Sequence, residues 1–468
     1  MKKILTCLLF VLTLVSMLLS SCALLPTAQQ NNQQPGTQPK ELSATEVLDS
    51  INERMDNVSS YEADSELEMS VYVDSKNMAI DGRSEIVVFQ EDDSYFYNST
   101  TMTITYNGVE SDAESIEGFD GGNYFISVSS GGKKRAFYSE LSSSEFDSFY
   151  ELISEDNSAL DGYKQISHVK TADGRYIVTL EKYDKRTVDV VNNSLGLPAE
   201  DGGGRISDIK VSIEADADFY IEYVTVEYIF TNDSFSGKRV TAYTNYGNAQ
   251  KVLGKLDTFD YKKVSDARAI RLYAKLLTDR QMAENGDFTF FTVQELSLSG
   301  QQSLNRETDT VNYGFDDNGY YFDVDADVNG QEINVSYKDG TYQINGKVQN
   351  NEDYTEDTAK TFINVLIYPF DFSPQDATTI TTHQLDSRTI QYSIKIDSIN
   401  SSLADKMKAT YRNAGGVCST AELVLSFTVK NNEIIYIGYK IQTSGSIKQS
   451  GVSYGMSLNI ETSTDFSD

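Results

Sequence analysis

The chain has 468 residues, with 39 Lys and Arg against 70 Asp and Glu, which gives a formal net charge of −31 at pH 7. A chain this acidic lacks the cationic surface that binding to nucleic acid phosphates requires, and anionic lipid headgroups would repel it. Its length leaves room for more than one hydrophobic core.

Residues 1–21 have the layout of a secretory signal, with a basic start at Met1–Lys3 and an apolar run from Ile4 to Leu19 that is too short for a stable membrane span. The following Leu19-Ser20-Ser21-Cys22 resembles the bacterial lipobox. This resemblance implies that Cys22 is acylated and becomes the new N-terminus, so that lipid holds an extracytoplasmic protein on the cell membrane. The alternative is an ordinary secretory signal with a chance cysteine.

Residues 22–40 are rich in Gln, Asn, Pro and Thr and read as a flexible tether. Because Cys7 leaves with the signal and Cys22 takes lipid, Cys418 has no partner for an intrachain disulfide. We expect it to be a small buried residue or a free thiol, so the fold must be held by its cores.

The folded part begins with a capping box at Ser43 and Glu46, and its helix carries apolar residues on one face as far as Val58. From Tyr61 to Val73 the apolar period becomes two, which predicts a long strand with one buried face. Further elements of this half are predicted as strands at 84–91, 94–98, 101–106 and 124–129, a helix at 139–154, and strands at 176–183, 206–215, 221–231 and 239–245.

The second half begins with a predicted helix over Asp266–Met282. The remaining predicted elements are strands at 288–298, 310–315, 320–328, 332–338 and 341–344, a helix at 358–368, a strand at 389–397, a helix at 402–413 that ends at Gly415 and Gly416, and strands at 421–429, 434–443 and 452–462.

The two halves share an order at their tails: an Arg-led strand, a short helix, glycines, a strand and a Tyr-rich strand. We therefore predict an α+β fold of two tandem domains, 41–262 and 263–468, each a strongly curved antiparallel sheet (a half-barrel) covered by a few short helices. The alternative is that the two halves are unrelated antiparallel sheets whose order of predicted elements is similar by chance.

The helix that runs through Asn57-Val58-Ser59-Ser60-Tyr61-Glu62-Ala63 into a long alternating strand, behind a lipobox and a tether, resembles the LolA-like lipoprotein superfamily, which includes mycobacterial cell-wall lipoproteins. The resemblance implies an unclosed barrel, lidded by helices, that holds acyl chains in an apolar hollow. The lining residues that it implies are Leu67, Met69, Val71, Val87 and Phe89 in the first domain, and Phe322, Val324, Ile333 and Val335 in the second.

Asp325-Ala326-Asp327-Val328-Asn329-Gly330 matches the opening of a calcium loop, but position 12, which should be Glu, is Ser336. Asn329-Gly330 is also a strong type I′ turn. Pairing outward from that turn sets Ala326 opposite Ile333, Val324 opposite Val335 and Phe322 opposite Tyr337, all apolar and on one face. We therefore predict a hairpin and no metal site.

Catalysis with a histidine base can draw only on His168 and His383, and neither lies in a nucleophile motif. No zinc-protease, phosphate-loop or dinucleotide fingerprint is present in the sequence. We therefore predict no catalytic residues, no cofactor and no enzymatic activity.

These patterns favour a lipoprotein that binds or carries a hydrophobic ligand, with the acylated ligands of the superfamily as a model. The main alternative is a surface module with packed cores that binds a protein or an envelope polymer. A hydrolase that uses paired carboxylates is a third reading. The sequence leaves the ligand and the oligomeric state open.

Overall fold

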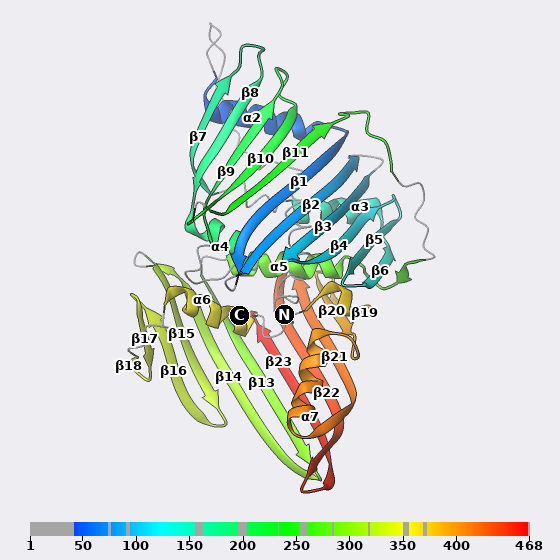
Figure 1. Ribbon diagram of the computed structural model, residues 1–468, viewed down its shortest axis with the longest axis vertical. Coiled ribbons are helices and arrows are strands. Elements are labelled where there is room, and N and C mark those ends of the chain that lie inside the picture. The colour runs from blue at the N-terminus through cyan, green and yellow to red at the C-terminus, as the bar shows by residue number, and fades with distance from the viewer. Residues whose placement is uncertain are drawn as a thin grey trace. The chain divides into compact units, whose positions relative to one another are not determined.

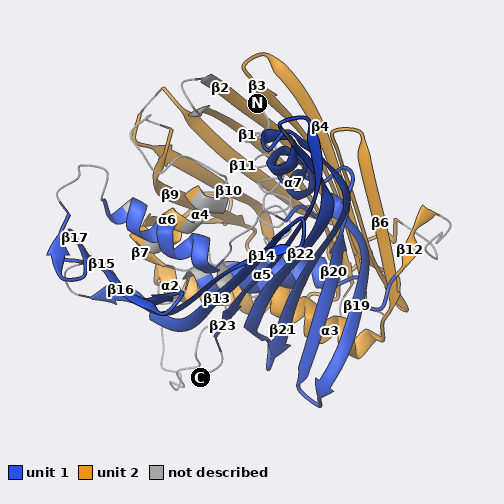
Figure 2. Ribbon diagram, turned by 90° about the horizontal axis from the view of Figure 1, so that it is seen from below, with its two compact units in different colours: residues 1–6, 264–468 blue, residues 7–263 orange. Residues whose placement is uncertain are grey.

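The computed structural model describes residues 42–73, 76–89, 94–154, 162–194, 204–232, 234–252, 260–282, 285–316, 319–349, 355–367 and 372–466. The predicted signal, Cys22 and the predicted tether lie outside these ranges. The chain divides into two compact units with a boundary between Lys263 and Val264; Figure 2 colours the N-terminal unit orange and the C-terminal unit blue. Of the described helices, none has the length and apolarity to cross a membrane.

The N-terminal unit is mostly strand. Its helices are α2 (Ala44–Asp56), α3 (Ser143–Ser154) and α4 (Lys185–Ser194). Its strands are β1 (Ser60–Val73), β2 (Lys76–Phe89), β3 (Tyr95–Tyr106), β4 (Val109–Phe119), β5 (Asn123–Ser130), β6 (Lys133–Glu140), β7 (Tyr163–Lys170), β8 (Tyr176–Tyr183), β9 (Ile206–Ala215), β10 (Ile221–Phe230), β11 (Ser236–Thr244) and β12 (Lys262–Lys263).

The C-terminal unit has the same character. Its helices are α5 (Ala269–Met282), α6 (Glu356–Ile367), the 3-10 turn η5 (Pro374–Asp376) and α7 (Ser402–Asn413). Its strands are β13 (Asn285–Leu298), β14 (Gln301–Asp316), β15 (Gly319–Val328), β16 (Gln331–Lys338), β17 (Thr341–Ile344), β18 (Lys347–Val348), β19 (Ala377–Asp386), β20 (Thr389–Ile396), β21 (Gly416–Lys430), β22 (Glu433–Gln449) and β23 (Val452–Asp465).

Each unit is built on one large, antiparallel-rich sheet, and the two sheets share one topology (Figure 1). In the N-terminal unit the first six strands form a meander, the chain crosses to the far edge after α3, and β7 to β11 return until β11 pairs with β1. In the C-terminal unit β13 to β18 form the meander, the crossing follows α6, and β19 to β23 return until β23 pairs with β13. The short helices α4 and α7 interrupt the returning strands at equivalent places.

We call the face of each sheet that carries the helices its inner face. In the N-terminal unit, Tyr61, Ala63, Ser65, Leu67, Met69 and Val71 of β1 are all buried on this face, as the period of two predicts. The ring of Phe146 on α3 stacks 4.2 Å from that of Phe119 on β4, and Phe149 meets Tyr124 of β5 at 5.2 Å. Helix α2, which begins with the predicted capping box at Ser43, lies against β7 and β8.

In the C-terminal unit the inner face is covered in a similar way. Tyr273 of α5 packs 5.2 Å from Phe427 of β21, and its hydroxyl lies 2.9 Å from that of Tyr439 on β22. On α6, the ring of Phe362 lies 5.3 Å from that of Phe322 on β15. Helix α7 runs along β21 and β22, where the Tyr411 hydroxyl is 3.0 Å from Thr443 Oγ1 (Figure 1).

The β15–β16 hairpin has the predicted register. Ala326 pairs with Ile333, Val324 with Val335, and Phe322 with Tyr337. The turn residues have the positive φ values of a type I′ turn, 56° at Asn329 and 83° at Gly330. The calcium-loop motif is therefore occupied by a strand and a turn.

Several elements differ from the sequence prediction. The strands expected at 94–98 and 101–106 are one continuous strand, β3, because Ser99 and Thr100 pair in register with both neighbours. Strands β4, β6, β7 and β19 were not predicted, since polar or charged residues outnumber apolar ones in each. Tertiary pairing with an apolar neighbour overrides their weak local signal.

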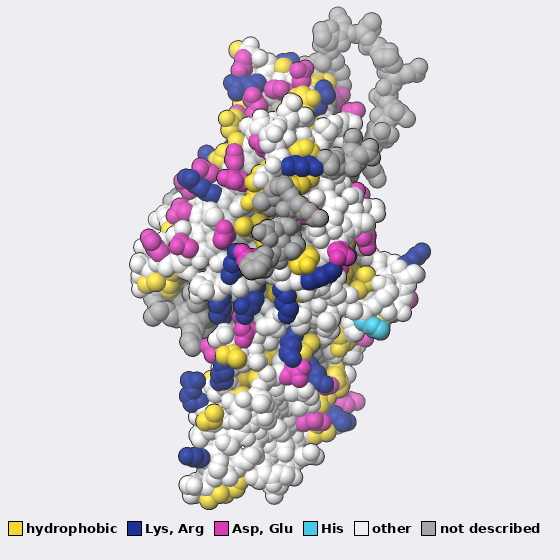
Figure 3. All heavy atoms as spheres, turned by 90° about the vertical axis from the view of Figure 1, so that its right-hand side faces the viewer, with side chains coloured by type: hydrophobic (Ala, Val, Ile, Leu, Met, Phe, Trp, Pro, Cys, Tyr) yellow, Lys and Arg dark blue, Asp and Glu magenta, His cyan; other side chains and the backbone are white. Residues whose placement is uncertain are grey.

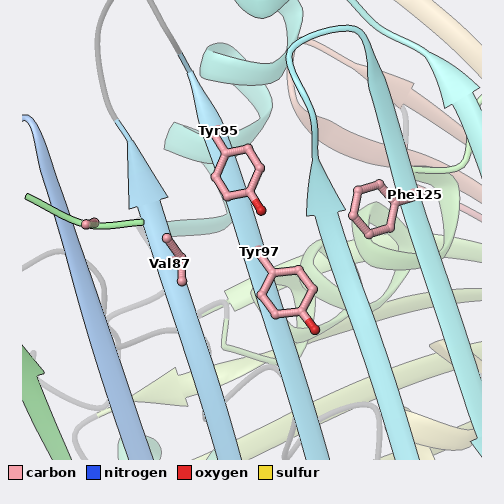
Figure 4. Packing of buried hydrophobic residues seen from close by; sticks show 5 residues of the cluster. Val87, Tyr95, Tyr97 and Phe125 are labelled. Carbon is pink, nitrogen blue, oxygen red and sulfur yellow. The ribbon is translucent and has the colours of Figure 1, made fainter. Parts of the chain in front are cut away.

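A second cluster lies on the outer face of the N-terminal sheet. It contains Val87, Tyr95, Tyr97, Phe125 and Ala249, which are buried (Figure 4). The segment after β11 turns back to cover these strands: Gly247 N donates to Ser60 O over 2.8 Å, and Lys251 Nζ lies 5.1 Å above the ring of Phe89. Tyr261 then meets Phe125 edge-on at 5.8 Å.

Gly118 makes room for this outer cluster, because a Cβ at this position would overlap the ring of Phe125 and lie 2.7 Å from Phe96 O. We expect Gly118→Ala to lower the free energy of unfolding by about 1–3 kcal/mol, the usual cost of overpacking. Urea denaturation followed by tyrosine fluorescence measures this change. Gly455→Ala is the matched control on β23, where nothing lies within 4 Å of the added methyl; equal effects of the two variants would contradict the expectation.

Candidate functional site

The structure splits the predicted lining of the first domain between two faces. Leu67, Met69 and Val71 are buried on the inner face of β1. Val87 pairs with Glu62 and Phe89 with Ser60, so both side chains point to the outer face, where they join the cluster under Ala249 and Lys251. The single lining formed by all five residues was therefore wrong. The end of β2 carries apolar residues on both faces, and the segment after β11, with Ala249 and Lys251, covers the outer one.

The inner apolar face is much longer than the region where α3 packs. The aromatic residues of α3 meet β3 at Phe96, whereas Met102, Ile104 and Tyr106 lie on the same face of β3 beyond the buried polar Asn98 and Thr100. At about 3.4 Å per residue, Phe96 and Tyr106 are about 34 Å apart along the strand. Leu67, Met69 and Val71 lie across β2 from these residues, so the inner face carries an apolar stripe three strands wide.

In the C-terminal unit all four predicted residues share the inner face, as their pairing shows. They differ in burial: Phe322 and Val324 are each 1% exposed, whereas Ile333 and Val335 are half-buried. The ring of Phe322 is packed among those of Phe362, Tyr337 and Tyr342 at centroid distances of 5.3–6.3 Å. Phe322 therefore belongs to a filled core, and accessible apolar surface begins only beyond it.

Half-exposed apolar side chains continue across the inner face towards the hairpin ends of β13 to β16 and β23. They are Ala326, Val328, Ile333, Val335, Leu458 and Ile460, together with Leu296, which is 37% exposed. In Figure 1 this part of β13 and β14 lies beyond α6 and beside α7, with no described helix drawn over it. A sheet face of this kind leaves apolar surface for a ligand to cover. We call it the open inner face.

A buried carboxyl borders the open inner face. Asp309 of β14 is 2% exposed, and its Oδ1 has no hydrogen-bond partner in the described part of the chain. It lies between Phe290 of β13 and Ala326 of β15. Burial, with a smaller contribution from the Glu307 carboxylate, raises the pKa of Asp309 to about 7. Sequence reasoning missed this residue, although Asp309 stands two residues before Val311 and four before Tyr313 and so shares their face.

The repeat shows how unusual this carboxyl is. In each unit the first and last long strands pair, and two buried hydroxyl groups form a hydrogen bond across this pair. The hydroxyl oxygens of Ser65 and Thr241 are 3.0 Å apart, as are those of Thr292 and Thr462. When the sheets are aligned on these pairs, the registers set Asp309 at the position of Ile86. The fold can therefore fill this position with an apolar side chain, so it does not itself require a carboxylate.

A separate hollow of about 310 Å³ lies over β1, β2 and β3. Its floor is the row Leu67, Gly82 and Met102, and the side chains around it are polar: Glu66, Glu68, Asp81, Arg83, Thr101 and Thr103. Since Leu67 and Met102 are at most 3% exposed while most of the polar residues are exposed, the hollow opens on the outer face. Only Leu67 of the predicted lining touches it, and its polar walls do not suit an apolar ligand.

The residues considered for catalysis or metal binding lie apart from one another. His168 and His383 occupy the edge strands β7 and β19 of their units. When the sheets are aligned on the same hydroxyl pairs, the registers set His168 at the position of Ile380 and not of His383. Asp323 and Asp325 both accept hydrogen bonds from Asn334 Nδ2, at 2.8 and 2.9 Å, and Asp327 Oδ1 accepts from Gly330 N. Across the described ranges, no group of three or more His, Cys, Asp and Glu side chains is arranged to hold a metal ion.

Cys418 is a free thiol at the start of β21. It is half-buried and donates to Thr420 O over 3.3 Å. Partial burial raises the pKa of this thiol, against smaller opposing effects of Lys408 and of the backbone hydrogen bond. The thiolate is the reactive form of cysteine, and these surroundings disfavour it.

Charged side chains of both signs are interspersed over the surface that Figure 3 shows. Several of them form exposed cross-strand ion pairs, such as Lys210 with Glu181 at 3.0 Å and Lys440 with Glu461 at 3.1 Å. Pairs of this kind contribute little stability, because water screens them. They place charged groups on the outer faces of the sheets, in contrast to the open inner face.

Comparison with known proteins gives no family. No protein-family profile matches the chain, and no curated protein matches it in sequence. Among solved structures, a β-barrel-like protein from a domain family of unknown function of Brucella abortus shares 9% identity over 40% of this chain and 98% of its own, with a TM-score of 0.18. A Nostoc punctiforme protein of unknown function shares 8% identity over 87% of this chain and 96% of its own, with a TM-score of 0.13. Likenesses at these TM-scores carry no argument about function.

The buried Asp309 predicts a dependence of stability on pH. Because the pKa of Asp309 is higher in the folded state, its neutral form favours folding below about pH 4, and this advantage is lost as the pH rises through 7. We expect Asp309→Asn to match the wild type near pH 4 and to exceed its free energy of unfolding at pH 8 by up to about 4 kcal/mol. Urea denaturation at both pH values tests this expectation. The exposed Asp325→Asn is the control, and a gain for Asp309→Asn that is equal at both pH values would contradict it.

Proposed function

We propose that this chain is an extracytoplasmic, membrane-anchored lipoprotein that binds a hydrophobic ligand on the inner faces of its sheets and carries out no catalysis. The observation that carries the proposal is the open inner face. Ile333 and Val335 are half-buried and Leu296 is 37% exposed, so apolar side chains that share this face stay partly accessible. Water-exposed apolar surface of this extent is costly, and an apolar ligand would remove the cost.

The shared topology supports the same reading. A long sheet with its helices on one face can form the half-barrel that the superfamily resemblance implies. Both inner faces carry apolar residues past their helices. Met102, Ile104 and Tyr106 are buried in the N-terminal unit, whereas Ile333 and Val335 are only half-buried in the C-terminal unit. The anchor rests on the lipobox at Cys22, and the acidic charge agrees with it, because such a chain needs lipid to stay on an anionic surface.

A second candidate is a surface module without a small ligand. The packing of Phe322 among three rings and the covering of Val87 and Phe89 by the segment after β11 favour it, since these residues fill cores. A mature wild-type chain that binds no apolar probe would support this candidate against the first.

The open inner face can be tested with a charge. We expect Val335→Asp to weaken binding of the neutral probe N-phenylnaphthylamine about tenfold or more, because a carboxylate would be desolvated beneath the ligand. Ser336→Asp adds the same charge one residue further on, on the opposite face of β16. Fluorescence titration of residues 23–468 measures both affinities, and circular dichroism checks their folding. Equal losses would contradict the assignment of the face.

The anchor has its own test. We expect Cys22→Ser to abolish incorporation of labelled palmitate and to release the chain from the membrane fraction, since the acylated sulfur is lost. Cys418→Ser is the control and should remain membrane-bound and labelled. A Cys22→Ser chain that still fractionates with the membrane would contradict anchoring through this residue.

A further inference from the structure

Asp309 stands where the filled core of the C-terminal unit ends. On one side of it lie Val311 and Val324, each at most 1% exposed. The half-buried Ala326 pairs directly with Asp309, and on the other side lies the half-buried Val328. The carboxyl therefore lies at the boundary between the filled core and the open inner face.

The side chain has few partners in the fold. Its Oδ1 accepts no hydrogen bond within the described chain, although an unpaired buried carboxyl oxygen is costly. The strands on either side set the uncharged Phe290 and Ala326 next to it. Glu307, two residues along β14, adds a second carboxylate to the same face. On α6, which packs against β15, the ion pair of Lys360 and Glu356 lies at the rings of Phe315 and Tyr320.

We propose that Asp309 is the polar anchor of the ligand site, and that the ligand is an amphiphile whose cationic amine donates a hydrogen bond to its carboxylate while the alkyl chain lies along the open inner face. This inference rests on the proposed function and deepens it by assigning the class of ligand. Two carboxylates on one apolar face favour a cation and oppose fatty acids and other anionic lipids. The equivalent Ile86 of the N-terminal unit offers no such anchor.

A set of probes with one chain length separates the head group from the tail. Isothermal titration of residues 23–468 with dodecylamine, dodecanol and laurate at pH 8 compares a cation, a neutral alcohol and an anion. We expect dodecylamine to bind at least tenfold more tightly than laurate. Asp309→Asn, which keeps the shape of the side chain, should remove this preference. Asp325→Asn, an exposed carboxylate on the opposite face of β15, should keep it.

The affinity for dodecylamine can also be measured as a function of pH. A purely structural role of Asp309 would not make this affinity follow the ionisation of its carboxyl group. Dodecylamine stays cationic from pH 5.5 to 8, so a change in its affinity reports on the protein. With a pKa of about 7, Asp309 is ionised in about 3% of molecules at pH 5.5 and about 90% at pH 8. The affinity should therefore fall about thirtyfold at the lower pH in the wild type and should stay nearly constant in Asp309→Asn.

The outcomes distinguish this inference from the proposed function. If the wild type binds all three probes equally, or if Asp309→Asn keeps the preference for the amine, the anchor is overturned while an apolar site remains. If the wild type binds none of the three probes, the proposed function itself fails. Circular dichroism of each variant excludes unfolding as the cause of lost binding.

Discussion

Each unit depends on the pairing of its first long strand with its last. β1 lies between β2 and β11, and β13 between β14 and β23, so residues such as Ser65 and Thr241, 176 positions apart, share one hydrogen-bonded ladder. Ser65 and Thr241 in one sheet, and Thr292 and Thr462 in the other, bridge this junction with buried hydroxyls. Without the junction each sheet would separate into two meanders, and neither meander alone would provide the wide inner face on which the helices pack.

The same plan leads to different surfaces in the two units. The N-terminal sheet is apolar along its inner face and is also covered on its outer face, where the segment after β11 lies across Tyr95, Tyr97 and Phe125. The C-terminal sheet has a filled core around Phe322, a half-exposed apolar region beyond it, and a carboxyl where the repeat has an isoleucine. One repeated architecture can thus present different surfaces in its two units, because cross-strand packing tolerates changes at single positions once the register is fixed.

The outer faces of the two sheets carry charged side chains instead of apolar ones. These charges pair across neighbouring strands, as in Lys210 with Glu181. Charged side chains on long strands also oppose the pairing of one sheet with another chain. The hollow beside Arg83 belongs to this polar surface. The distribution of charge and the period of two along the strands both separate this polar outer face from the apolar inner face.

The sequence by itself determined the local elements and, where a turn fixed it, the register. The alternation from Tyr61 to Val71, the capping box at Ser43 and the Asn329-Gly330 hairpin were all predicted, because each depends on residues that are close along the chain. Only the tertiary structure decided that Val87 and Phe89 face away from Leu67, that Ile333 stays half-exposed while Phe322 is buried, and that Asp309 is enclosed. These facts follow from register between strands and from which distant segment covers a face, and a period of two contains neither.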